Sequence, residues 1–252
     1  MSASARTDAR GAERARQEAQ RKDAGRRRAV AWGGGVLIVV LLVAIAAAVV
    51  SARGGGQEPQ AAGAVVVPAN ATAEGAIALG QVDAPVTVTV FFDYLCPFCG
   101  RFEAANGAEL EGLTRSGVAR VELRPMSFLD PQSQGTEYST RAENALATVA
   151  DGSPERLEAF HRGLFDEQPA EGTAGLDDQR ITEIARTAGV AEAVAERFAA
   201  RSFDRWVAQG TERAFASGID GTPTVLVDGE VFGGDLYAAG PLTEAVRAAA
   251  DR

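Results

Sequence analysis

Cysteine and histidine are nearly absent from this chain, whose 252 residues include two Cys and a single His, His161. A structural zinc site needs four ligands, and one Cys pair with one histidine does not supply them. The sequence therefore predicts no metal site, and no other cofactor is expected. His161 lies in a helical pattern, where we expect it either on the helix surface or packed in the core.

Positive charge is scarce over most of the chain. Residues 54–252 contain 15 Arg, no Lys and 30 Asp or Glu, so this part carries a net charge of about −15. An acidic surface repels phosphate groups, which argues against nucleic acid or anionic lipid as a partner. The first 28 residues differ, because they hold nine Lys or Arg against four Asp or Glu.

Long apolar runs are also missing, with one exception at residues 30–50. This run has 21 residues without a charge, and about 20 apolar residues are needed to cross a bilayer. Three arginines at 26–28 precede it, so the positive-inside rule places the N-terminus in the cytoplasm. We predict a basic cytoplasmic tail (1–29), a single-pass anchor in the cell membrane (30–51) and an extracytoplasmic remainder. The alternative is a signal peptide cleaved near residues 50–52, which gives the same export.

The remaining residues divide into a linker and one domain. Residues 52–76 are rich in Gly, Ala, Pro and Gln, which predicts a linker. Residues 77–252 are enough for a domain with its own core. Hydrophobic periodicity and breakers predict, in order, a strand at 86–92, a helix from 97, a strand within 118–128, a helical region at about 138–217, a hairpin turning at 228–229 and a helix at 241–250. This order predicts an α/β domain interrupted by an all-helical insertion.

The two cysteines, Cys96 and Cys99, form a Cys-x-x-Cys motif where the first strand pattern meets a helix pattern. Pro97 suits the first position of that helix, where no N–H group is needed. Two intervening residues place both sulfurs on one face of the first turn, close enough for a disulfide. The helix start stabilises an anion, so we predict that Cys96 is the nucleophile and Cys99 the resolving thiol.

A purely structural disulfide is the alternative interpretation of the pair. A loop this short removes little chain entropy from the unfolded state, about 2 kcal/mol. A structural crosslink would stabilise more by joining distant segments. Redox chemistry is therefore the favoured interpretation.

The sequence resembles the DsbA-like proteins of the thioredoxin superfamily. Two segments carry the resemblance: Phe-Phe-Asp-Tyr-Leu-Cys-Pro-Phe-Cys at 91–99 and Gly-Thr-Pro-Thr at 221–224. It covers residues 78–252 and implies a thioredoxin-like α/β fold with an all-helical insertion, here preceded by one transmembrane helix. The anchored, Arg-rich and Cys-poor format is similar to the membrane-tethered extracytoplasmic members found in actinobacteria.

The resemblance implies a set of site residues and partners. Pro223 would be the cis-proline that faces the cysteine pair, and Thr222 would offer backbone hydrogen bonds to a substrate strand. Cys96 and Cys99 would form the redox-active disulfide, with Pro97 and Phe98 between them contacting substrate. The implied partners are thiols of exported proteins and a membrane redox partner such as a quinone-linked enzyme.

Some positions depart from the family pattern. Phe98 stands where strongly oxidising members have histidine, and it cannot donate a charge-assisted hydrogen bond to the Cys96 thiolate. Val90 stands where many relatives keep a buried acid that shuttles protons. Asp93 either takes over that proton transfer or serves as a turn or cap residue at the strand end. Tyr94 and Phe98 either form an apolar rim that faces substrate or simply pack.

Three functions fit these residues. The favoured one is an extracytoplasmic thiol–disulfide oxidoreductase that introduces disulfides into exported proteins. The second runs the same exchange in reverse, as a reductase or isomerase, because direction depends on the reduction potential of the pair. The third is a non-catalytic, peptide-binding scaffold whose disulfide is inert.

Overall fold

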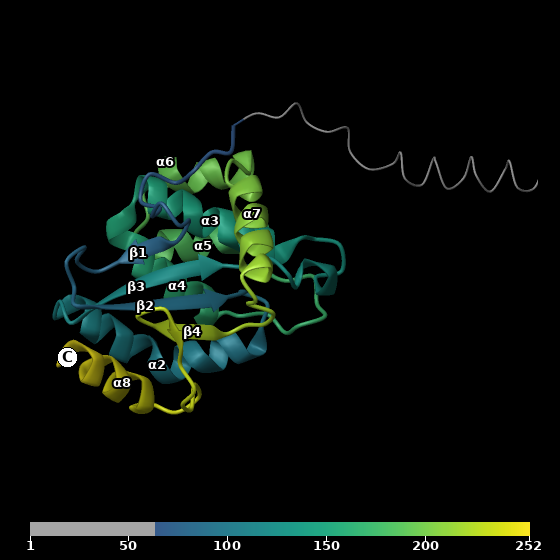
Figure 1. The fold of residues 1–252 in the computed structure, drawn as a ribbon. Coiled ribbons are helices and arrows are strands. Elements are labelled where there is room, and N and C mark those ends of the chain that lie inside the picture. The colour runs from purple at the N-terminus through teal and green to yellow at the C-terminus, as the bar shows by residue number, and fades with distance from the viewer. Residues whose placement is uncertain (1–63) are drawn as a thin grey trace, which may run out of the picture. The chain divides into compact units, whose positions relative to one another are not determined.

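A five-stranded mixed sheet forms the centre of the computed structural model, which describes residues 64–252 (Figure 1). The strand order is β1-β3-β2-β4-β5, with β2 and β3 parallel and the other neighbours antiparallel. The strands are β1 (Ile77–Leu79), β2 (Val86–Phe92), β3 (Ala119–Pro125), β4 (Thr224–Val227) and β5 (Glu230–Val231).

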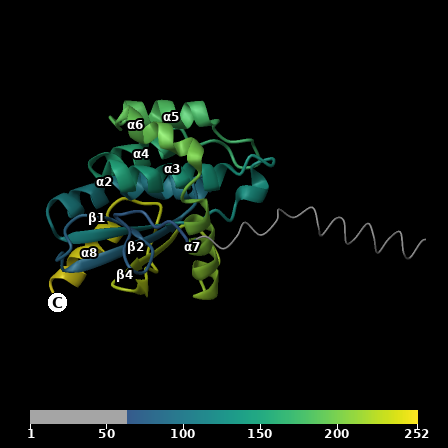
Figure 2. The same ribbon diagram turned by 90° about the horizontal axis from the view of Figure 1, so that it is seen from above.

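A helical segment separates β3 from β4 in the chain, and it runs from the start of α3 to the end of α7. Figure 2 shows α3, α4, α5 and α6 stacked on one side of the strands. The helices are α2 (Pro97–Arg115), α3 (Tyr138–Gly152), α4 (Leu157–Asp166), α5 (Asp178–Thr187), α6 (Glu192–Ala195), α7 (Asp204–Ala216) and α8 (Pro241–Ala250). Short 3₁₀ turns are η1 (Asp130–Gln132), η2 (Pro154–Arg156) and η3 (Glu196–Ala200).

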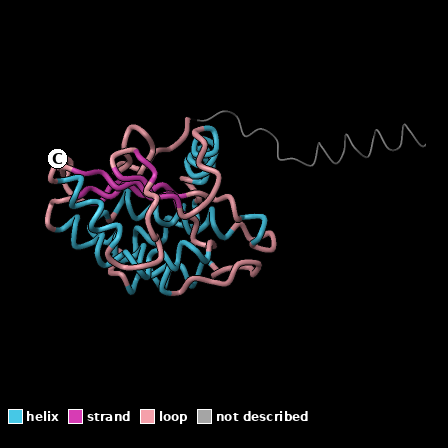
Figure 3. The backbone as a smooth tube through the Cα atoms, turned by 60° about the horizontal axis from the view of Figure 1, so that its bottom comes forward, coloured by secondary structure: helices cyan, strands magenta, loops and turns pink. Residues whose placement is uncertain are grey.

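The alternation in β2 places its side chains on two faces of the sheet. Val88, Val90 and Phe92 point into the main core, whereas Phe91 lies in a second cluster with Ala214 of α7. Figure 3 shows most of the helices on one side of the strands. Apolar side chains of β2 are thus buried on both faces, and the strand ends four positions before Cys96.

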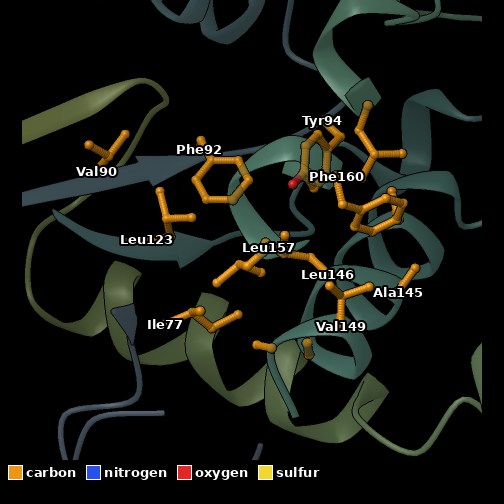
Figure 4. Packing of buried hydrophobic residues seen from close by; sticks show 14 of the residues in the cluster. Ile77, Val90, Phe92, Tyr94, Leu123, Ala145, Leu146, Val149, Leu157 and Phe160 are labelled. Atoms are coloured by element: carbon orange, nitrogen blue, oxygen red, sulfur yellow. The ribbon is translucent and has the colours of Figure 1, made fainter. Parts of the chain in front are cut away.

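The helical segment shares its core with the sheet. Figure 4 shows Phe92 and Tyr94, from β2 and the loop after it, near Leu146 of α3 and Phe160 of α4. All four side chains are almost completely buried. The insertion therefore packs against the segment that leads into Cys96, and its side chains can position the site.

Residues 64–76 differ from the linker predicted over 52–76. Val65 and Ala71 pack against the core, and the Ala69 N–H donates to the Asp151 carboxylate at 2.9 Å. Arg124 of β3 donates to the Glu74 carbonyl at 2.7 Å. The prediction is wrong for this half of the segment, because two scattered apolar contacts and two hydrogen bonds leave no periodic pattern in the sequence.

The hairpin at one edge of the sheet was predicted from the sequence, whereas the strand at the other edge was not. The hairpin between β4 and β5 turns at Asp228 and Gly229, whose φ values of 50° and 85° suit a tight two-residue turn. The short edge strand β1 was not predicted, because three residues are too few to establish a period of two. β1 pairs antiparallel with β3 from Ile77 to Leu79.

No helix within residues 64–252 combines the length and apolar character needed to span a bilayer. The transmembrane anchor predicted at residues 30–51, the basic tail and the cleavage site near 50–52 all lie outside the described residues.

Candidate active site

Cys96 lies at the N-terminal end of α2, as predicted, where it is the N-cap residue with Pro97 at the first helical position. Its thiol donates a hydrogen bond to the Thr222 carbonyl, with Sγ and O 3.3 Å apart. A hydrogen bond from the Cys99 thiol, together with the Thr222 side chain and the backbone N–H groups of Phe98 and Cys99, lowers the pKa of Cys96 to about 6, although burial opposes the shift. At neutral pH most Cys96 is therefore thiolate, even though only 4% of the residue is exposed.

Cys99 lies one turn into α2 and is buried, with 1% of its surface exposed. Burial is the main reason that its pKa is raised well above the usual value, and the neighbouring Cys96 adds to the shift. The pair is therefore asymmetric: one sulfur is ionised near neutral pH and the other keeps its proton. This is the division of roles expected of a nucleophile and a resolving thiol.

The second motif meets the first because β4 pairs with β2. Phe91 of β2 pairs with Thr224 of β4, so the residues just before β4 lie beside the end of β2. The Thr222–Pro223 peptide bond is cis, and Thr222 contacts Cys96 across 126 positions of sequence. The structure thus brings together Cys96, Cys99, Thr222 and Pro223.

Asp93 is completely buried three residues before Cys96. Its carboxylate accepts hydrogen bonds from the backbone N–H groups of Leu95 (2.8 Å) and Leu129 (3.0 Å) and from the Ser139 hydroxyl (2.6 Å). Burial outweighs these bonds and raises the pKa of Asp93 to about 7. Asp93 can therefore hold the loop together and also exchange a proton near neutral pH, so the two predicted roles are compatible.

Glu143 is a second buried acid, and the sequence analysis missed it. It lies in α3, is completely buried, and both of its carboxyl oxygens lack a hydrogen-bond partner among the described residues. Burial raises the pKa of Glu143 well above its usual value, and the charges of Asp93 and Asp130 raise it further. The one feature of the sequence that points to its burial is its place in the helical pattern, between Ala142 and Ala145, which are also buried.

Tyr94 points into the core and does not form a rim that faces substrate. It is fully buried, and its hydroxyl is 2.7 Å from Nδ1 of His161 in α4. Nε2 of His161 lies 3.6 Å from the Glu103 carboxylate of α2. His161 is therefore a packed core residue and not a surface one, and it joins the loop before Cys96 to two helices.

Gln168, just after α4, binds the same loop and was not predicted. Its side-chain amide donates to the carbonyls of Tyr94 (3.0 Å) and Cys96 (2.8 Å). A Cβ atom on Gly100 would lie 2.2 Å from Oε1 of Gln168, so the glycine leaves the space that this amide occupies. No motif spacing reveals this contact, because 68 residues separate the glycine from the glutamine.

Exposed groups surround the buried sulfurs. Pro97 is exposed, and Phe98 is 49% exposed, so both residues between the cysteines are open to a partner. Among residues 64–252 no group of three or more His, Cys, Asp or Glu side chains is placed to hold a metal ion. The two sulfurs, one with a lowered and one with a raised pKa, are suited to the exchange of thiols and disulfides.

Comparison with known proteins agrees with this geometry. The family model described as thioredoxin matches residues 72–243, which is more than half of the chain. The chain belongs to the thioredoxin family. Within this family it is similar to DsbA-type proteins: the structure of oxidised DsbA from Mycobacterium tuberculosis is 29% identical, with a TM-score of 0.61 over 70% of this chain and 93% of that one. The predicted thioredoxin-like fold is confirmed.

Other similar proteins extend the comparison. Oxidised BdbD from Bacillus subtilis shares the fold, with a TM-score of 0.62 and 23% identity over 74% of this chain and 98% of that one. Disulfide bond formation protein D of Bacillus subtilis is 27% identical over 160 residues, or 63% of this chain and 70% of the relative. Serine/threonine-protein kinase PknE of Mycobacterium tuberculosis is 32% identical over 115 residues, which are 44% of this chain and only 20% of the kinase.

Proposed function

We propose that this thioredoxin-family protein is a thiol–disulfide oxidoreductase that oxidises thiols of exported proteins. The observation that carries the proposal is the asymmetry of the pair: the pKa of Cys96 is lowered to about 6, while that of Cys99 is raised. An inert structural disulfide has no need of one stabilised thiolate. The cis Thr222–Pro223 bond beside Cys96 and the similarity to DsbA-type proteins support the same activity.

The exchange conserves atoms and electrons. A substrate thiolate attacks Sγ of Cys96 in the oxidised pair, a mixed disulfide forms, and Cys99 leaves as a thiolate that takes up a proton because its pKa is raised. A second substrate thiolate then attacks the substrate sulfur of the mixed disulfide and releases the Cys96 thiolate. Two substrate thiols lose two electrons and become a disulfide, and the cysteine pair gains those electrons. A membrane redox partner, such as a quinone-linked enzyme, would reoxidise the pair.

The direction of electron transfer depends on whether the reduced or the oxidised form of the cysteine pair is stabilised. A thiolate with a lowered pKa stabilises the reduced pair, which raises its reduction potential and favours oxidation of substrates. Phe98 opposes this tendency, because it offers the thiolate no charge-assisted hydrogen bond. A reductase or isomerase is therefore the second candidate.

The proposed location rests on the sequence. The uncharged run at residues 30–50 with arginines before it would anchor the protein in the cell membrane, with the cysteine pair outside the cytoplasm. Protease treatment of intact cells tests this topology: residues 64–252 should be cleaved and the first 29 residues protected. Protection of both parts would contradict it.

The decisive experiment is the reduction potential of the Cys96–Cys99 pair, equilibrated against glutathione buffers. A value of about −120 to −180 mV supports the oxidase, whereas about −270 mV, as in thioredoxin, supports a reductase. A pair that does not exchange with glutathione supports the non-catalytic scaffold. Cys96→Ser should abolish transfer to a reduced substrate protein, and full activity of that variant would contradict the mechanism.

A further inference from the structure

An exposed cluster of two aromatic rings and one cation includes Phe98, which lies between the two cysteines in the sequence. Phe98 is 49% exposed and Tyr237, in the segment between β5 and α8, is 40% exposed. Their ring centroids are 6.1 Å apart although 139 positions separate them in sequence. The Tyr237 segment is held in place, because Asn106 of α2 donates to the Leu236 carbonyl at 2.8 Å.

Arg101 joins the two rings. Its guanidinium carbon lies 4.4 Å from the centre of the Tyr237 ring and 5.7 Å from that of Phe98. Phe98 and Arg101 are three residues apart on α2, so they share a face of the helix that Cys96 begins. A stacked guanidinium uses its flat face for the ring and leaves its in-plane N–H donors free.

Arg101 also has no carboxylate partner among the described residues, although it is exposed in an acidic chain. Other exposed arginines in this part of the chain do pair, as Arg180 does with Glu167 at 2.6 Å. Asp235 has the carboxylate nearest in sequence to Tyr237, and it accepts a hydrogen bond from the Tyr237 N–H group. This cation, on the same helix as the two cysteines, is therefore left available to a partner.

We propose that Arg101, held between Phe98 and Tyr237, binds a carboxylate side chain of the substrate polypeptide next to its reacting cysteine. The inference rests on the proposed exchange activity and adds a substrate class to it: segments in which Asp or Glu accompanies the cysteine. A planar guanidinium matches a carboxylate through two parallel hydrogen bonds. The acidic surface of the chain repels such segments in general, so one local cation can decide which residue of an acidic segment reaches Cys96.

Dithiol peptides of one sequence, with Glu, Gln or Lys placed one to four residues to either side of the reacting cysteine, test this proposal. We expect the oxidised full chain to oxidise the best Glu peptide about two to five times faster than its Lys counterpart, in kcat/KM, as for a partly exposed ion pair. In Arg101→Gln the ratio should fall to about 1 or below, because the acidic surface alone favours the Lys peptide, and in Arg101→Glu it should fall further. The ratio is taken within each variant, so a general change in reactivity cancels.

Two matched controls distinguish the effect of the Arg101 guanidinium from the effects of overall charge and of the Tyr237 ring. Arg115→Gln removes the same charge from the far end of α2 and should keep the Glu preference. Tyr237→Phe keeps the ring under the guanidinium and should keep the preference, whereas Tyr237→Ala should weaken it. High salt should also weaken it, because exposed charges are screened.

The outcomes distinguish this inference from the proposed function. Exchange with dithiothreitol but equal rates for Glu, Gln and Lys peptides at every position would overturn the role of Arg101 alone. A Glu preference that persists in Arg101→Gln would overturn it as well. No exchange with dithiothreitol at all would overturn the oxidoreductase itself.

Discussion

At the scale of single residues, the reactivity of the site depends on surroundings that shift the pKa values of its two thiols in opposite directions. Both cysteines are almost fully buried, so exposure does not distinguish them. The balance between hydrogen bonding and burial distinguishes them. For Cys96, hydrogen bonds from the Cys99 thiol and from N–H groups at the helix start outweigh burial, whereas burial is the largest influence on the pKa of Cys99. The same two sulfurs one turn further into a helix would lack the free N–H groups.

We predict that Cys96 reacts with iodoacetamide with a half-maximal rate near pH 6, while Cys99 stays unmodified through neutral pH. Mass spectrometry of the reduced protein after alkylation at a series of pH values measures both. Cys99→Ala should move the Cys96 profile to higher pH, because it removes the thiol that donates to the thiolate. Cys99→Ser keeps a donor and should move it less. Identical profiles for all three proteins would contradict this account.

Glu143 leads to a second prediction at this scale. Its pKa is raised in the folded protein, so unfolding releases a proton above the usual glutamate pKa and stability falls as pH rises. Glu143→Gln removes this penalty, and its advantage in unfolding free energy should grow by up to about 1.4 kcal/mol per pH unit above pH ~4.5.

Denaturant unfolding between pH 4.5 and 8 measures the difference between wild type and Glu143→Gln. Glu171→Gln, at an exposed glutamate, is the matched control and should show no such dependence. An advantage that is constant across this pH range would mean that Glu143 is ionised in the folded protein.

At the scale of elements, the helical segment holds the loop that carries Cys96. Tyr94 is bonded to His161 of α4, and Gln168 after α4 donates to two carbonyls of the same loop. The N–H groups that stabilise the Cys96 thiolate belong to the turn that this loop begins. The insertion therefore acts on the chemistry by fixing the position of those groups.

The effect of Gly100→Ala on the free energy of unfolding should change sign when Gln168 is also replaced. Gly100→Ala should destabilise the wild type or leave it unchanged, since the new Cβ displaces the Gln168 amide and costs hydrogen bonds of about 0.5–1.5 kcal/mol each. In a Gln168→Ala background the space is empty, so the same change should stabilise α2 by up to about 1 kcal/mol. Unfolding free energies of the four proteins measure this coupling.

The pKa of Cys96 gives the second readout for this pair. Gln168→Ala and Gly100→Ala should each raise the pKa of Cys96, because the loop and the first turn of α2 lose the hydrogen bonds donated by the Gln168 amide. Gln179→Ala removes a comparable side-chain amide, bonded to Glu183 in α5, and should leave the pKa unchanged. An equal effect of Gly100→Ala in both backgrounds would show that the amide and the glycine are not coupled.

At the scale of the whole molecule, the folded unit begins before the first strand. Residues from Ala64 onward belong to one compact unit with the domain. A fragment covering 64–252 should therefore fold and exchange disulfides, whereas a fragment covering 77–252 should lose about 1–3 kcal/mol of stability with the contacts of Val65, Ala69 and Ala71. Thermal unfolding of the two fragments compares them, and equal stability would restore the linker boundary predicted from sequence.

The sequence by itself determined the features that depend on neighbours along the chain. The alternation of residues 86–92, the proline after Cys96 and the turn at Asp228 predicted a strand, a helix start and a hairpin, and the structure contains all three. These features can be recognised from a few neighbouring positions, since side-chain alternation, the fixed φ of proline and the turn residues are local properties of the sequence. The polarity of the cysteine pair follows from them, because the helix start stabilises an anion.

Only the tertiary structure decided what surrounds that pair. Thr222 reaches Cys96 because β4 pairs with β2, and Gln168 reaches the Cys96 carbonyl because α4 packs on the sheet. The burial of Glu143 and the stacking of Arg101 on Tyr237 likewise join segments far apart in the chain. Such contacts depend on how whole elements pack, and packing is set by the sum of many apolar contacts that no single spacing in the sequence encodes.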